Sequence, residues 1–193
     1  MPLYEAFLEA FVAAYNEAHK QHAAQWPAIW GDYGRFSDFM LYDNDSVIKR
    51  TAPAMQLGCY HGEPLRLDAV FTNDSQEGWN WFPPVVIIEH ENNPKGFHGE
   101  VQKLLSVRAQ LKVGITYFLI GDRGNPDQLF AHLIGLIGRL FNQAGGNIQE
   151  SPKSEYLFVV GVEHSERILS WYQLNFTAGV GVGNIRFEPV NAG

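Results

Sequence analysis

The feature that most constrains the fold is a pair of short, unbroken apolar runs. Val85–Ile88 consists of four β-branched residues, and Ile115–Ile120 is an apolar run bounded by glycines. Strands without polar alternation are typical of a sheet that is covered on both faces. A chain that contains such strands needs helices to cover them, so the two runs predict an α/β protein.

Segments with helical periodicity lie on either side of these strands. Residues 3–22 place Leu3, Phe7, Phe11 and Ala14 on one face, as an amphipathic helix does. The predicted elements are, in chain order, helix 3–22, a loop over 25–36, a short helix within 37–50, strands 65–72 and 85–91, helix 98–112, strand 115–120, helix 126–144, and strands 156–162 and 168–176. This order predicts one domain over residues 1–193, with a three-layer α/β core and a mixed sheet.

Composition and charge narrow the class of protein. Cys59 is the only cysteine among 193 residues, so no intrachain disulfide can form and a reducing, cytoplasmic location is expected. The opening residues 1–11 lack the basic region of a signal peptide, and no apolar run approaches the roughly 18 residues of a membrane span. The net charge of −7 argues against general attraction to nucleic acid, although a local basic groove remains compatible with it.

The strand at 85–91 ends in two acids, Glu89 and Glu91. Alternate strand residues share a face, so these carboxylates should lie on one face roughly 7 Å apart, with His90 on the opposite face. Asp68 lies in the preceding strand and comes alongside Glu89 if the two strands pair. Three carboxylates at one sheet edge suit Mg²⁺ or Mn²⁺, which prefer oxygen ligands.

A simpler interpretation of the same acids is that they solvate the exit of the strand into a loop. The residues that follow, Asn92–Pro94, have the composition of a turn. The combination favours a site instead: an acid in one strand, a loop, a buried strand that ends in two acids, and then a helix with further polar side chains.

The spacing of Asp68 and Glu89-His90-Glu91 after a β-branched run resembles the core of the PD-(D/E)XK nuclease superfamily, which has the restriction-endonuclease-like fold. The order of helices and strands over residues 3–142 is similar to that fold as well. Two positions depart from the family pattern. Leu67 stands where the motif has proline, and Glu91 stands where it has lysine.

The resemblance implies a role for each of these residues. Asp68, Glu89 and the backbone carbonyl of His90 would hold one divalent ion, Mg²⁺ or Mn²⁺. Glu91 or Lys103 would orient or deprotonate the attacking water, and Glu91 would serve as a general base or help to hold a second ion. Lys103, on the following helix, is the substitute for the missing motif lysine.

Three more side chains are candidates by the same resemblance. Glu17, on the flank of the first helix, would approach the metal as first-helix acids do in some relatives, and otherwise it faces solvent. Glu100 and Gln102 match the acid or glutamine that other members place on the helix after the motif. Glu100 and Lys103 lie one turn apart, so a solvated ion pair between them is the alternative.

Two functions follow from the resemblance. The first is a metal-dependent endonuclease that hydrolyses phosphodiester bonds, with DNA favoured over RNA, as a homodimer because no separate recognition domain is visible. The second is an inactive member of the same fold that binds a protein or a nucleic acid. The aromatic segment at residues 78–82 would either stack on splayed bases or plug the sheet.

Overall fold

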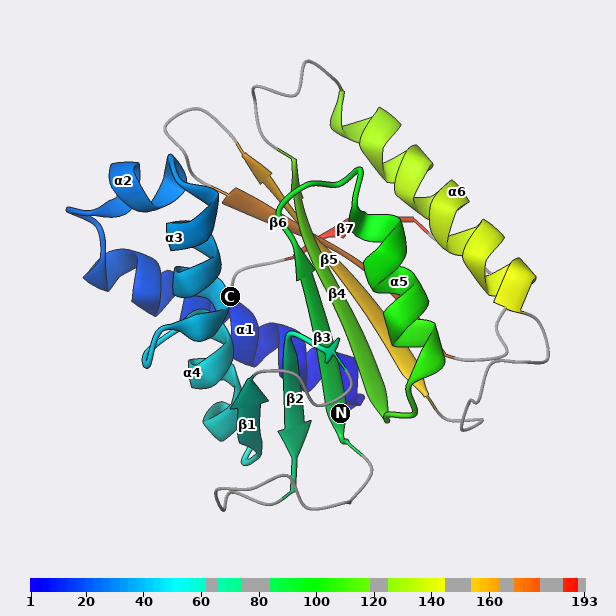
Figure 1. Ribbon diagram of the computed structural model, residues 1–193, viewed down its shortest axis with the longest axis horizontal. Coiled ribbons are helices and arrows are strands. Elements are labelled where there is room, and N and C mark those ends of the chain that lie inside the picture. The colour runs from blue at the N-terminus through cyan, green and yellow to red at the C-terminus, as the bar shows by residue number, and fades with distance from the viewer. Residues whose placement is uncertain are drawn as a thin grey trace. The chain divides into compact units, whose positions relative to one another are not determined.

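The computed structural model confirms an α/β protein with a mixed sheet. It describes residues 1–61, 66–73, 84–118, 125–144, 154–163, 169–177 and 186–190. Seven strands in these ranges form one sheet: β1 (Gly58–His61), β2 (Ala69–Thr72), β3 (Val86–Glu91), β4 (Leu111–Phe118), β5 (Glu155–Glu163), β6 (Leu169–Thr177) and β7 (Glu188–Pro189). Their order in the sheet follows their order in the chain (Figure 1). The pair β4–β5 is parallel, whereas β1–β2, β5–β6 and β6–β7 are antiparallel.

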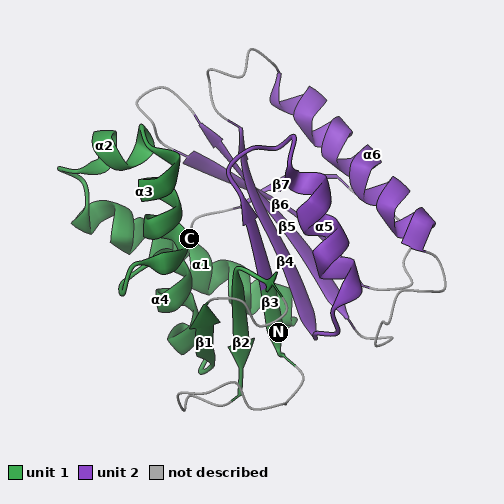
Figure 2. Ribbon diagram, viewed as in Figure 1, with its two compact units in different colours: residues 1–87 green, residues 88–193 purple. Residues whose placement is uncertain are grey.

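The helices divide between two compact units of the chain. Residues 1–87 form the first unit and residues 88–193 the second, so the boundary falls inside β3 (Figure 2). The first unit contains α1 (Leu3–Gln21), α2 (Trp26–Trp30), α3 (Tyr33–Ser37), the π-helix η1 (Asp38–Tyr42) and α4 (Val47–Ala54). The second unit contains α5 (Phe97–Ser106) and α6 (Pro126–Ala144). No helix of the described ranges has both the length and the apolar character that a membrane crossing requires.

The first unit packs around the apolar stripe of α1, as predicted. Phe7 and Phe11 are fully buried, and the Phe7 ring centroid lies 6.1 Å from that of Phe71 on β2. α1 also packs against α4. The predicted helix 3–22 is therefore confirmed, with its apolar side chains contributing to a core as their spacing indicates.

The loop predicted over residues 25–36 is wrong, because this stretch forms α2 and α3. Pro27 lies in the first turn of α2, where a missing N–H has no helical partner to lose. Asp32 caps α3 by accepting hydrogen bonds from the backbone N–H groups of Gly34 and Arg35 at 2.8 and 3.1 Å. Proline and glycine thus mark helix starts here, and the aromatic side chains between them pack into the unit.

The strand predicted over residues 65–72 is shorter than expected. β2 begins at Ala69, and Arg66 has a φ of 60°, a left-handed conformation that an extended strand excludes. Asp68 therefore lies immediately before β2 rather than within it. β1, a strand that was not predicted from the sequence, pairs with β2 and aligns Cys59 with Phe71.

In the second unit, α5 and α6 lie side by side, and α5 packs on β4 (Figure 1). The predicted helix 126–144 is confirmed as α6. The predicted helix 98–112 is wrong at its end, because Val107 is extended and the chain enters β4 at Leu111. Leu104 and Leu111 are seven residues apart, which is about two helical turns, so the apolar pattern of a helix continues across this turn. The predicted end of the helix was therefore placed too late.

One glycine sets how closely α5 approaches the sheet. A Cβ atom on Gly114 of β4 would lie 2.8 Å from Cζ of Phe97 and 2.9 Å from Cδ1 of Phe158. The Phe97 and Phe158 rings meet edge to face with centroids 6.0 Å apart. The first residue of α5 is therefore packed directly over the β4 backbone, which fixes where the rest of the helix lies.

Candidate metal centre

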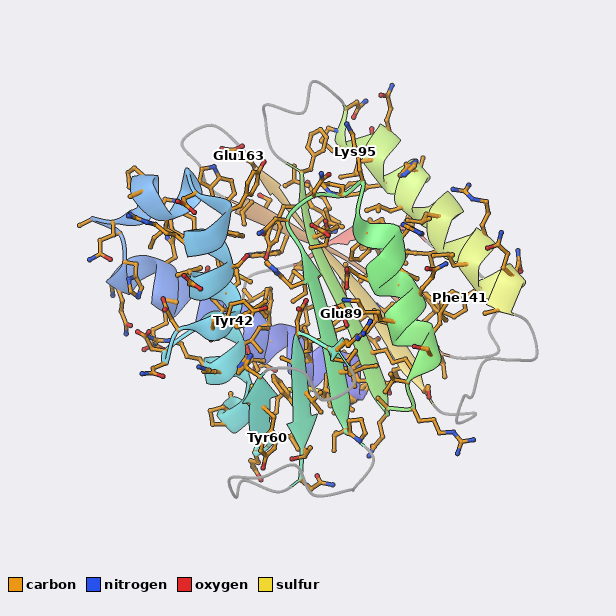
Figure 3. The ribbon with its side chains drawn as sticks, viewed as in Figure 1. Tyr42, Tyr60, Glu89, Lys95, Phe141 and Glu163 are labelled. Atoms are coloured by element: carbon orange, nitrogen blue, oxygen red, sulfur yellow. The ribbon has the colours of Figure 1, made fainter. Side chains whose placement is uncertain are left out.

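β3 carries a carboxylate into the interior of the protein. Val86, Ile87 and Ile88 are fully buried, and Glu89 is equally inaccessible at 0% exposure. A carboxylate without solvent is costly unless a cation or hydrogen bonds compensate for the lost water. Figure 3 labels Glu89 on β3, and its side chain meets groups from α5.

The compensating cation for Glu89 is Lys103 of α5. Its Nζ donates to Oε2 of Glu89 at 3.0 Å and lies 2.5 Å from Oε2 of Glu100. Glu100 stands one helical turn before Lys103 and is 16% exposed. The ammonium therefore bridges two acids, one of them wholly buried. The alternative of a simple solvated pair between Glu100 and Lys103 omits this third partner.

The electrostatics of α5 follow from this bridge. Burial raises the pKa of Glu100, but its hydrogen bonds with Glu89 and Lys103, together with the Lys103 charge, outweigh burial and lower the pKa. Burial lowers the pKa of Lys103, but its bonds to Glu100 and Glu89 and their charges outweigh it and raise the pKa. At neutral pH, Lys103 is therefore an ammonium and Glu100 a carboxylate.

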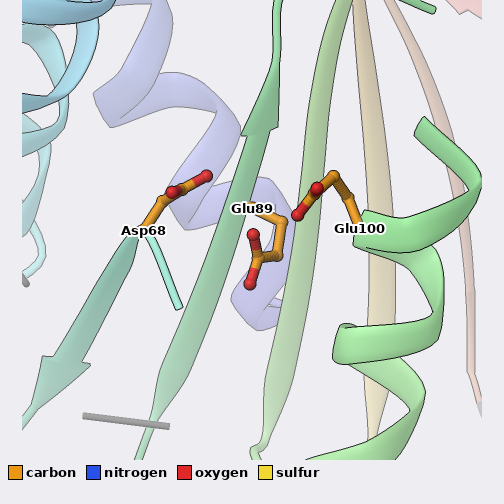
Figure 4. A group of neighbouring side chains, drawn as sticks. All are labelled: Asp68, Glu89 and Glu100. Atoms are coloured by element: carbon orange, nitrogen blue, oxygen red, sulfur yellow. The ribbon is translucent and has the colours of Figure 1, made fainter. Parts of the chain in front are cut away.

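A third carboxylate, Asp68, completes the group. One carboxylate oxygen of Asp68, one of Glu89 and one of Glu100 all lie within 4.8 Å of one another (Figure 4). The predicted neighbours Asp68 and Glu89 are thus brought together. The three acids form an anionic group, and the Lys103 ammonium neutralises part of its charge.

Glu91 contacts the turn that follows β3. Its Oε1 accepts a hydrogen bond from the backbone N–H of Asn93 at 2.8 Å. Its Oε2 lies against Gly96, where an added Cβ would be 2.6 Å away. The side chain thus closes the turn between β3 and α5, and Glu91 is not a member of the three-carboxylate group.

His90 lies on the opposite face of β3, as alternation predicts. Its Nε2 lies 3.0 Å from the Tyr117 hydroxyl of β4, and the side chain is 8% exposed. Burial lowers the pKa of His90 to about 4, against the opposing effects of the Glu100 charge and a backbone hydrogen bond. The imidazole is therefore neutral at pH 7. Metal ligation by the His90 carbonyl remains a prediction.

Glu17 is occupied by partners on the surface of the first unit. Its Oε1 lies 3.2 Å from Nη1 of Arg50 and accepts from Nε2 of Gln21 at 3.1 Å. The Glu17 side chain is 64% exposed.

Gln102, which was a candidate together with Glu100 on α5, is also exposed. Neither side chain belongs to the three-carboxylate group. The aromatic segment at residues 78–82 lies outside the described residues.

Comparisons of this chain with protein-family models, with curated proteins and with solved structures found no match. The function must therefore be inferred from the chemistry of the site. The main departure from the sequence analysis is Glu100, which takes the third position in the acidic group while Glu91 closes a turn. The position of Glu100 in the first turn of α5, three residues before Lys103, was the sequence signal for it.

Proposed function

We propose that this protein is a divalent-metal-dependent phosphodiesterase that cleaves nucleic acid, with Asp68, Glu89 and Glu100 as its metal ligands. The observation that carries this proposal is the convergence of three carboxylate oxygens within 4.8 Å around a fully buried Glu89. Carboxylate oxygens are the ligands that Mg²⁺ and Mn²⁺ prefer, and no thiolate or imidazole belongs to the group.

The spacing of the oxygens supports a shared ion. Octahedral Mg²⁺ has ligands at about 2.1 Å, so its neighbouring oxygens are about 3 Å apart and its opposite oxygens about 4.2 Å apart. Separations of at most 4.8 Å are close enough that small side-chain rotations would bring the oxygens to these values. Glu89 is the rigid member because it is buried on a strand, whereas Asp68 and Glu100 are half-buried and can adjust.

When bound, the ion supplies Lewis-acid polarisation of a phosphodiester oxygen and an acidified water. The protein's own groups do the remaining work. Glu89 would fix the position of the ion, and Asp68 and Glu100 would supply its other protein ligands. The Lys103 ammonium is the basic group nearest to these acids among the contacts described, and it would orient a phosphate oxygen or the attacking water.

Membership of the PD-(D/E)XK superfamily is part of the proposal. It is supported by the order α1, β2, β3, α5, β4, α6 and by an acid immediately before β2 followed by an acid near the end of β3. The proposal includes a three-layer restriction-endonuclease-like core, action on DNA in preference to RNA, and a homodimer. Glu91 remains the residue at the position of the motif lysine.

Isothermal titration calorimetry with Mn²⁺ on metal-free protein tests the metal site. Wild type should bind with one site per chain, and Glu89→Gln should weaken binding at least tenfold because it removes a charged ligand without changing the side-chain volume. Glu17→Gln is the matched control, since it removes one acid from a surface ion pair. Equal affinities in Glu89→Gln and wild type would rule out the site.

Cleavage is tested separately on supercoiled plasmid, single-stranded DNA and RNA with Mg²⁺ or Mn²⁺. We expect cleavage products that disappear in Glu89→Gln and on chelation with EDTA.

A second function, a non-catalytic binding module of the same fold, is favoured by one observation: Lys103 already neutralises part of the acidic group. Mn²⁺ binding without cleavage of any of the three substrates would support that second function.

A further inference from the structure

Lys103 already occupies the position where the charge of a metal ion would act. Its Nζ contacts Oε2 of the buried Glu89 at 3.0 Å and Oε2 of Glu100 at 2.5 Å. These are two of the three side chains assigned above to the ion. The Lys103 ammonium therefore serves as a counter-cation of the acidic group, and both of its carboxylate partners are candidate metal ligands.

Simultaneous binding of an ammonium and a divalent ion to the same two carboxylates is unfavourable. Their like charges repel strongly where one carboxylate is wholly buried, because screening by solvent is weak there. The ammonium also donates a hydrogen bond to Oε2 of Glu89 and lies in contact with Oε2 of Glu100, two oxygens that the ion would use. Binding of the ion therefore requires that Lys103 move, or that the ion accept only the remaining oxygens.

The side chain of Lys103 has a route away from the acids. It is 39% exposed while Glu89 is 0% exposed, so the lysine reaches the buried carboxylate from the solvent side of α5. A flexible four-carbon stem can carry the ammonium outward without a change in the helix, because its charged end is already near water. Glu89 on its buried strand has no comparable freedom.

We propose that Lys103 is an exchangeable counter-cation, which holds the acidic group together without metal and leaves Glu89 and Glu100 when a divalent ion binds. This inference rests on the proposed function. Metal loading is then the exchange of one ammonium for one ion, and the affinity for metal is set partly by the lysine that must be displaced. The released ammonium becomes available to an anionic phosphate.

The first test is Mn²⁺ and Mg²⁺ calorimetry on wild type, Lys103→Met and Lys95→Met. Methionine retains the length of the stem without the charge. Removing the competitor should tighten metal binding roughly 10- to 100-fold, as expected for the loss of one unit charge at contact distance. Lys95 is exposed and outside the bridge, so Lys95→Met should stay within about twofold of wild type.

The second test follows the ammonium itself in wild-type protein, so it does not depend on how well a variant folds. In ¹⁵N-lysine-labelled protein, the Lys103 ammonium signal should be protected from exchange without metal and should lose that protection as Mg²⁺ saturates. Its assignment comes from its absence in Lys103→Met. Unchanged or weaker metal binding by Lys103→Met, or a signal still protected at saturating Mg²⁺, would overturn the exchange. Wild type and Lys103→Met that both fail to bind metal would overturn the proposed site as well.

Discussion

The two faces of β3 carry buried ionisable side chains, and the cost of burying them is met in two different ways. Glu89 is compensated by the ammonium of Lys103, whereas His90 stays neutral beside the Tyr117 hydroxyl. The two residues are adjacent in sequence and almost equally inaccessible. Their neighbours decide the outcome, since the Glu89 face is reached by a partly exposed lysine and the His90 face by an uncharged phenol. The face with the exchangeable charge is the face suited to bind an ion.

The largest effect expected from this comparison is the pH dependence of the His90 face. The pKa of His90 is about 4 in the folded protein and 6.5 in the unfolded chain, so the unfolded state binds the extra proton first. The contribution of His90 to stability is therefore complete above pH 6.5 and declines as pH falls toward 4, by about 3 kcal/mol in total. Urea unfolding of wild type and His90→Gln between pH 7 and 4 measures it. Parallel curves for the two proteins would contradict a buried, neutral imidazole.

On the Glu89 face, Lys103→Met should destabilise the metal-free protein by about 2–3 kcal/mol at pH 7. Losing one partner of a buried ion pair costs about 3–5 kcal/mol, and the 39% exposure of Lys103 reduces that figure. Added Mn²⁺ should restore much of the loss, because the ion replaces the missing charge. Thermal or urea unfolding with and without Mn²⁺ is the measurement. A variant as stable as wild type without metal would show that the bridge contributes nothing.

Tyr117→Phe tests the contact on the His90 face of β3. It removes the hydroxyl beside Nε2 of His90 while preserving the ring, so the free energy of unfolding at pH 7 should fall by about 1–2 kcal/mol. The metal affinity should not change, since Tyr117 lies on the face away from the acidic group. Urea unfolding and Mn²⁺ calorimetry on the same preparation check both statements. A tenfold change in metal affinity would mean that the two faces are coupled.

The smallest effect is expected for Glu17→Gln in the first unit. Its ion pair with Arg50 has the same charge types as the Glu89–Lys103 pair, yet the Glu17 side chain is 64% exposed. Exposed pairs contribute about 0–1 kcal/mol, so the free energy of unfolding should change by less than about 0.5 kcal/mol. A loss as large as that of Lys103→Met would show that burial does not separate the two pairs.

Pattern and periodicity predicted the parts of the fold that follow from single segments. The helix at residues 3–22, the strand ending at Glu91 and the helix at 126–144 have strong apolar periodicity or uninterrupted apolar character, and each forms as expected. The failures fall where the chain turns without the usual signals. α5 ends before β4 with no glycine or proline between them, and α2 and α3 contain Pro27 and Gly34 as their second residues, although proline and glycine more often interrupt helices.

The candidate site was predictable to a similar extent. Strand alternation placed Glu89 toward the acidic group and His90 away from it, because both directions follow from the geometry of one strand. Strand alternation did not show that Glu91 would accept a hydrogen bond from the backbone N–H of Asn93, since this bond depends on the conformation of the following turn. The third carboxylate, Glu100, depends on how α5 packs against the sheet, which is a tertiary property that no local pattern specifies.

Gly114 has a consequence that reaches beyond its own strand. The space beneath Phe97 exists only because residue 114 has no side chain, and Phe97 begins the helix that carries Glu100 and Lys103. A single methyl group at Gly114 would force the rings of Phe97 and Phe158 to shift, and Phe97 is the first residue of the helix that positions both side chains relative to Glu89. Gly114 thus affects the alignment of Glu100 and Lys103 with Glu89 without contacting any of them. Mutational tolerance at this strand position is therefore a sensitive indicator of whether the acidic group is used.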